Sequence, residues 1–142
     1  MANLDVGLVA CSRLKADRPL PARELYVSPL FRAARAYAER RYGPERWFIL
    51  SARHGLVHPD QVLAPYDLRL RQLTAAEREA WGYRVAVELT DRFPAGTVLW
   101  FHAGALYRTA IADVVAHQVR APLAGLGIGI GQQLGWYRRQ RA

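Results

Sequence analysis

The sequence predicts an α/β fold: a single three-layer domain over residues 1–142, with a mostly parallel sheet of about four strands flanked by helices. Three observations carry this prediction. Short apolar runs alternate with longer segments in which apolar residues recur at helical spacing. Proline and glycine mark the boundaries between these segments. The length of 142 residues is enough to build one domain around one hydrophobic core.

The first strand and the first helix have clear signals. Residues 4–11 form a short apolar run that ends in a polar, proline-containing loop, as expected for a buried strand. Ser28 is a good helix N-cap, and Pro29 suits the first helical position. Apolar residues then recur at helical spacing until Gly43, which ends the predicted helix.

The middle of the chain predicts a second strand, a long loop and a second helix. Residues 47–51 are aromatic and aliphatic, which favours a compact strand. Residues 52–73 contain prolines and a glycine without a clear period, so we expect a long loop of the kind that often carries function. Thr74 and Glu77 have capping-box spacing, which predicts a helix that runs to about Phe93.

The last third continues the alternation. Residues 97–101 predict a third strand, and residues 106–117 predict another helix. Residues 119–126 have room for a short fourth strand, and a glycine-rich turn at 125–131 leads into a final helix near 132–139. This turn lacks the context of a dinucleotide-binding fingerprint; either its backbone approaches another segment closely, or its amides contact a phosphate.

The basic charge of the chain favours a polyanionic partner. The formal net charge is +8 and the isoelectric point is about 10.4. Arginines that neutralise phosphates release counterions, so we expect a nucleic acid, DNA first, or a nucleotide. The alternative is a solvated basic surface. Only one of the 20 basic residues is a lysine, Lys15, which either serves as a compact point charge or deprotonatable amine, or persists by chance.

Cysteine content and terminal composition indicate the compartment. The single cysteine, Cys11, excludes an internal disulfide and a multi-cysteine metal site, so we expect no metal, no cofactor and a reducing cytoplasm. Cys11 ends an apolar strand, where a quiet buried thiol is expected rather than a nucleophile. The first residues lack the layout of a secretion signal, and no apolar stretch reaches membrane-spanning length. We therefore expect a cytoplasmic protein without membrane contact.

Polar residues gather at the ends of the three predicted strands. Carboxyl ends of parallel strands share one edge of a sheet, which is where open α/β sheets bind ligands. We therefore expect one site there. The polar residues in question are Cys11, Ser12, Lys15, Ser51, Arg53, His54 and His102.

Four segments in order resemble the YaaA-like superfamily. They are residues 10–15 (ACSRLK), 50–56 (LSARHGL), 65–68 (PYDL) and 102–107 (HAGALY). The resemblance covers about residues 6–110 and is to the small, stand-alone members. It implies nucleic-acid or nucleobase chemistry in a stress or DNA-repair setting, with release of a base from its sugar as the implied activity.

The expected reaction is cleavage or transfer at an N-glycosidic bond, as in a DNA glycosylase. Such a transition state carries positive charge on the sugar and negative charge on the departing base. We assign catalysis to Asp67, which stabilises the sugar cation, with assistance from His54 and Lys15. We expect substrate binding by Ser12, Ser51, Arg53, Tyr66, His102, Gly104 and Tyr107.

Structural alternatives stay open for these residues. Asp67 either acts on substrate or caps a turn or pairs with an arginine, and His54 either acts on substrate or bonds loop carbonyls. His102 at a buried strand end fits a structural histidine. The second function class is a non-catalytic module that binds nucleic acid or nucleotide phosphate, with Lys15 and Arg53 gripping the phosphate.

Overall fold

The computed structural model describes residues 4–124 and 129–141 and shows a mixed α/β fold built on a five-stranded sheet. The sheet runs, in spatial order, β4 (Gly55–Val57), β3 (Trp47–Ser51), β1 (Asp5–Ala10), β6 (Val98–His102) and β7 (Gln118–Arg120). Strand β1 lies at the centre and pairs in parallel with β3 and β6, and β6 pairs in parallel with β7. Only the β3–β4 pair in this described sheet is antiparallel.

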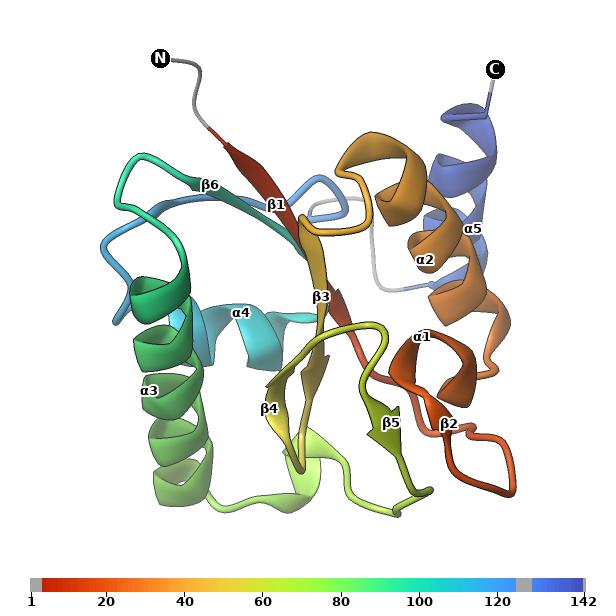
Figure 1. Ribbon diagram of the computed structural model, residues 1–142, viewed down its shortest axis with the longest axis horizontal. Helices are drawn as coiled ribbons and strands as arrows, with labels where there is room; N and C mark the ends of the chain where they lie inside the picture. The colour runs from red at the N-terminus through yellow and green to blue at the C-terminus, as the bar shows by residue number, and fades with distance from the viewer. Residues whose placement is uncertain (1–3, 125–128, 142) are drawn as a thin grey trace.

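Helices cover both faces of this sheet (Figure 1). One face carries α3 (Ala75–Arg92) and α4 (Ala105–Ala112); the other carries α1 (Ala22–Leu25), α2 (Pro29–Arg41) and α5 (Ile130–Arg139). Side chains of β1 alternate between the two resulting cores. Leu8 packs in the cluster that contains Leu89 of α3, whereas Val9 packs in the cluster that contains Phe31 of α2.

The predicted helix starts are confirmed by their caps. The Ser28 hydroxyl accepts a hydrogen bond from the Phe31 amide at 3.2 Å, and Pro29 is the first residue of α2. The Thr74 hydroxyl accepts from the Glu77 amide at 3.1 Å, while the Glu77 carboxylate accepts from the Thr74 amide at 2.8 Å. These bonds satisfy amides that a helix start leaves without partners.

The segment predicted as a long loop contains short strands, which raises the sheet to five strands rather than about four. Gly55 has a φ of +76°, which lets the chain reverse after β3, so that β4 pairs back onto it. All three residues of β4 are buried, so they show no alternation that would reveal a strand. Further along, β5 (Val62–Leu63) pairs with β2 (Leu20–Pro21), and a 3₁₀ turn, η1, follows at Leu70–Gln72.

The carboxyl-terminal third differs in detail from the prediction. Helix α4 ends at Ala112, whereas the apolar pattern predicts a helix to residue 117. The short fourth strand is present as β7. Residues 125–128 of the glycine-rich turn lie outside the described residues. The final helix is described and begins at Ile130 with Gly129 as its N-cap, and the predicted contact of the amides at its start with a phosphate stays a prediction.

The close contact between α3 and α4 yields a test of the packing. Replacing a helical glycine by alanine normally stabilises a helix by about 1 kcal/mol. A Cβ atom at Gly82 of α3 would overlap the backbone carbonyl of Ala110 in α4. We therefore expect Gly82→Ala to lower the free energy of unfolding by about 1–3 kcal/mol, measured by urea denaturation.

The matched control is Gly131→Ala in α5, where a Cβ would meet no atom within 4 Å. This change should be neutral or stabilising by up to about 1 kcal/mol. If Gly82→Ala also stabilises the protein, the described approach of α3 to α4 is wrong.

Candidate functional site at the strand ends

The carboxyl ends of β1, β3 and β6 meet at one edge of the sheet, as the sequence predicts. In the register of the sheet Ala10 lies opposite Leu50, and Val9 lies opposite His102. The loops that leave these ends contain the predicted site residues. Loop residues from well-separated parts of the chain thereby come together.

Tyr66, from the long loop, lies at the centre of a group of side chains that we call the Tyr66 cluster: Lys15, Tyr26, Ser51, His54 and Tyr66. Its hydroxyl is hydrogen-bonded to the Ser51 hydroxyl at 2.7 Å and to the Tyr26 hydroxyl at 2.6 Å. The Lys15 Nζ atom lies 4.3 Å from the centroid of the Tyr66 ring, which is a cation–π contact. The His54 ring meets the same ring almost perpendicularly, with 5.3 Å between centroids. Two predicted catalytic residues therefore lie against one aromatic side chain.

Burial and nearby charges set the protonation behaviour of the Tyr66 cluster. Burial raises the pKa of Tyr26 to about 12 and raises the pKa of Tyr66 further, so both phenols are neutral at pH 7. Burial lowers the pKa of Lys15, and the proximity of Cys11 and Asp67 partly opposes that shift. Asp67 itself is exposed and follows Tyr66 directly in the chain.

His54 is uncharged at pH 7. Its pKa is lowered from 6.5, first by partial burial and then by the neighbouring Arg53 and Arg84. Its backbone amide donates a hydrogen bond to the Ser51 hydroxyl at 3.0 Å, which fixes the start of the loop. A neutral imidazole offers one N–H donor and one acceptor nitrogen to a ligand.

A cavity of about 450 Å³ adjoins the Tyr66 cluster. Three segments line it: residues 11–13 after β1, residues 68–71 of the long loop, and residues 104–107 at the start of α4. It therefore contains the predicted binding residues Ser12, Gly104 and Tyr107. Lys15, His54 and Asp67 are not among its lining residues, although Asp67 directly precedes the lining residue Leu68.

The only cysteine lines this cavity beside a half-buried tyrosine, Tyr107. The Cys11 sulfur lies 3.3 Å from the Tyr107 hydroxyl, within hydrogen-bonding distance for sulfur. Burial raises the pKa of Tyr107, with the nearby Cys11 adding to the effect. Tyr107 also packs edge-on against Trp81 of α3, with 5.6 Å between centroids, so its ring is fixed in place.

His102 has a structural position in the described fold. Its Nε2 atom is hydrogen-bonded to the Tyr42 hydroxyl at 2.8 Å, and its Nδ1 atom to the Tyr137 hydroxyl at 2.9 Å. Only 4% of its surface is exposed, and burial, aided by Arg41, lowers its pKa to about 4. The imidazole thereby joins β6 to α2 and α5, and the structure does not bring it to the Tyr66 cluster.

Arg53 is exposed, and its backbone carbonyl accepts a hydrogen bond from the Arg84 guanidinium at 3.4 Å. Among the described contacts, none joins its side chain to Lys15. The structure adds residues that sequence reasoning missed: Tyr26 in the cluster, and Arg13, Arg69 and Arg71 around the cavity. Arg13 lies within the 10–15 segment but was not singled out, and no motif marks Tyr26, Arg69 or Arg71, because their positions depend on how the two long loops fold.

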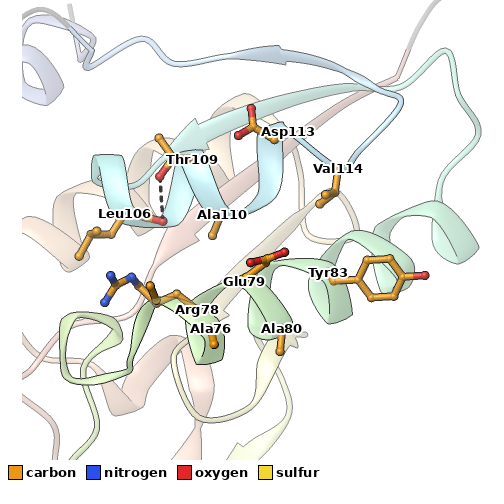
Figure 2. A pocket seen from close by; sticks show the side chains of 11 residues that line it. Ala76, Arg78, Glu79, Ala80, Tyr83, Leu106, Thr109, Ala110, Asp113 and Val114 are labelled. Atoms are coloured by element: carbon orange, nitrogen blue, oxygen red, sulfur yellow. Dashed lines mark hydrogen bonds between the residues drawn. The ribbon is translucent and has the colours of Figure 1, made fainter.

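A larger groove of about 670 Å³ lies between α3 and α4 (Figure 2). It is bordered by apolar side chains such as Tyr83 and Val114, and by the charged side chains of Arg78, Glu79 and Asp113. None of the predicted site residues borders it. Leu106 is shared between this groove and the smaller cavity.

Comparison with known proteins places the chain in a family. Residues 6–139 match the family described as a family of unknown function, DUF6884, so the chain belongs to that family. None of the curated proteins matches the sequence. Within residues 4–124 and 129–141, no group of three or more His, Cys, Asp or Glu side chains is arranged to hold a metal ion. The helices of the same residues include none with both the length and the apolar character needed to cross a bilayer.

The hydrogen bonds of the Tyr66 hydroxyl predict a stability cost for its removal. Tyr66→Phe keeps the ring under Lys15 but removes a partner from Ser51 and Tyr26, which are both buried. We expect the free energy of unfolding to fall by about 1–3 kcal/mol in urea denaturation. The control is Tyr83→Phe, whose side chain is 63% exposed; it should change stability by less than about 0.5 kcal/mol. If Tyr66→Phe and Tyr83→Phe change the free energy of unfolding by equally small amounts, the hydrogen bonds of the Tyr66 cluster do not form.

The buried imidazole of His102 predicts a pH dependence of stability. The folded protein keeps His102 neutral down to a pKa of about 4, whereas in the unfolded chain it titrates near 6.5. This stabilisation is complete above pH 6.5 and is lost as the pH falls toward 4, by about 3 kcal/mol in total. The measurement is urea denaturation at several pH values, for the native chain and for His102→Gln. A variant with the native pH dependence would contradict this account.

Proposed function

We propose that this member of the DUF6884 family cleaves an N-glycosidic bond in a nucleotide or nucleic acid, in line with the resemblance to the YaaA-like superfamily. The observation that carries the proposal is the arrangement around Tyr66. Lys15 lies over the face of its ring, the His54 ring stands perpendicular to it, and Asp67 follows it in the chain within electrostatic reach of Lys15. A carboxylate can stabilise the positive charge on the sugar, and an amine and an imidazole can stabilise the departing base.

In the proposed reaction the bond between the sugar C1′ atom and a base nitrogen breaks, and its electron pair leaves with the base. Asp67 stabilises the positive charge on the sugar and accepts a proton from the water that adds to C1′. His54, uncharged at pH 7, donates a hydrogen bond to the departing base. The departing base takes up one proton from solvent, and Asp67 releases the proton it accepted, so water is divided between C1′ (OH) and the base (H) and the sum is hydrolysis of the glycosidic bond.

Lys15 and Tyr66 have supporting roles in this proposal. Lys15 offers positive charge to the base as negative charge develops on it. Tyr66 positions Lys15 through its ring and is itself held by Ser51 and Tyr26. Tyr66, which contacts both Lys15 and His54, is thereby held in place by hydrogen bonds within the fold.

The second candidate function is a non-catalytic module that binds nucleotide phosphate. Two observations favour it: Asp67 is exposed to water, and the neighbouring cavity is lined by three arginines. Under this alternative Lys15 adds to the anion-binding surface, and Asp67 has no chemical task.

Two substitutions separate the candidates. Asp67→Asn removes the charge that the sugar cation needs, so we expect base release to fall by at least about 100-fold while binding is retained. Lys15→Ala should weaken both binding and base release. The measurement is free base, separated by chromatography, from nucleosides, nucleoside 5′-monophosphates, single-stranded DNA and duplex DNA.

The control is Asp91→Asn, an exposed carboxylate at the end of α3, which precedes β6 and so lies at the opposite edge of the sheet. It should leave base release unchanged. If the native chain releases no base from any of these substrates, while Lys15→Ala still weakens nucleotide binding, the binding module replaces the enzyme. If neither Asp67→Asn nor Lys15→Ala changes binding or base release, both proposals fail.

A further inference from the structure

We infer that the cavity beside the Tyr66 cluster binds the phosphate of a nucleotide unit, so that the ligand is a phosphorylated nucleotide or a strand rather than a free nucleoside. The identity of the group beside the phosphate, a base and its sugar, rests on the proposed function. The phosphate subsite itself rests on the charges and shape of the cavity.

Three arginines line this cavity from two directions. Arg13 comes from the loop after β1, and Arg69 and Arg71 come from the long loop before α3. Among the described residues, none of the three guanidinium groups is paired with a carboxylate. The three positive charges around this cavity repel each other, and a bound anion would attract each of them and offset that repulsion. Guanidinium groups also match the geometry of phosphate oxygens.

The start of α4 also lines the cavity, and its first amides have no side-chain cap. Gly104 is its N-cap and provides no side-chain cap, and the first helical bond runs from the Arg108 amide to the Gly104 carbonyl at 3.1 Å. The amides of residues 105–107 are therefore left without helical partners. A Cβ at Gly104 would meet no atom within 4 Å, and its φ of −68° is ordinary, so packing does not require glycine here. Together with the arginines, the bare helix start provides donors for phosphate oxygens.

The size and position of the cavity connect it to the Tyr66 cluster. A volume of about 450 Å³ is larger than a phosphate needs and leaves room for an attached sugar. The cavity and the cluster share two loops: Arg13 and Lys15 lie two residues apart, and Asp67 directly precedes Leu68 of the cavity wall. A nucleotide with its phosphate in the cavity can thus extend its sugar and base toward Asp67 and His54.

The test compares ligands that differ only in phosphate, titrated into the full chain. We expect a nucleoside 5′-monophosphate to bind at least about 10-fold more tightly than its nucleoside. Arg71→Ala should weaken monophosphate binding by about 10-fold and leave nucleoside binding unchanged. Arg71→Lys, which keeps the charge, should recover part of the loss.

An oligonucleotide without a terminal phosphate contains only phosphodiesters, so comparing it with a nucleoside monophosphate shows whether the cavity prefers a nucleic-acid strand or a mononucleotide. If the natural ligand is a strand, a short single-stranded oligonucleotide binds more tightly than the monophosphate, and Arg71→Ala reduces the salt dependence of binding by about one ion. If it is a mononucleotide, the monophosphate binds more tightly and inorganic phosphate competes with it.

The control is Arg40→Ala, which removes the same charge from an exposed position on α2 and should leave all affinities unchanged. Equal binding of nucleoside and monophosphate, or equal losses in Arg40→Ala and Arg71→Ala, would overturn the subsite. These affinity measurements do not require the protein to be catalytically active, so the phosphate subsite and the proposed enzymatic activity are tested independently. If binding depends on the phosphate but no base is released, only the proposed enzymatic activity is wrong. If bases are released rapidly from nucleosides and Arg71→Ala does not change that rate, only the proposed phosphate subsite is wrong.

Discussion

Ser51 is a fully buried residue at the end of β3, and the partners of its polar atoms organise the whole edge of the sheet. Its carbonyl accepts a hydrogen bond from the Trp81 indole at 2.9 Å, which ties β3 to α3. Its hydroxyl holds the His54 amide and the Tyr66 hydroxyl. A buried polar group without partners costs about 1–3 kcal/mol, so the fold must bring these segments to Ser51. The Tyr66 cluster is therefore a consequence of satisfying one strand end.

The same edge of the sheet holds two histidines that differ in burial and in hydrogen bonding. His102 is the last residue of β6, where aromatic side chains of α2 and α5 surround it and both ring nitrogens are hydrogen-bonded. His54 follows β3, where it is exposed, and Tyr66 is its partner among the described aromatic contacts. Both are uncharged at pH 7, yet only His54 can offer its nitrogens to a ligand.

Much of the fold could be predicted because its signals are local. Caps at Ser28 and Thr74 depend on residues three apart, and the apolar runs of β1, β3 and β6 are continuous. The antiparallel strand β4 could not be predicted, because a three-residue buried strand has no period and forms only on β3. Tyr26 was missed for a related reason: its bond to Tyr66 joins two loops whose paths depend on the β2–β5 pairing. The convergence of Lys15 and His54 could be predicted, since both follow parallel strands of one sheet.

The exposure of Asp67 decides what the proposed reaction requires of its substrate. Opposite charges about 4 Å apart attract by about 1 kcal/mol in bulk water but by about 4 kcal/mol at an effective dielectric constant of about 20. An exposed carboxylate therefore stabilises a sugar cation well only when the substrate itself excludes water from it. A phosphate held among Arg13, Arg69 and Arg71 would anchor the sugar over Asp67 and supply that cover. The phosphate lies away from the reacting bond, but its binding energy holds the sugar over Asp67. The Asp67 carboxylate can then stabilise the sugar cation.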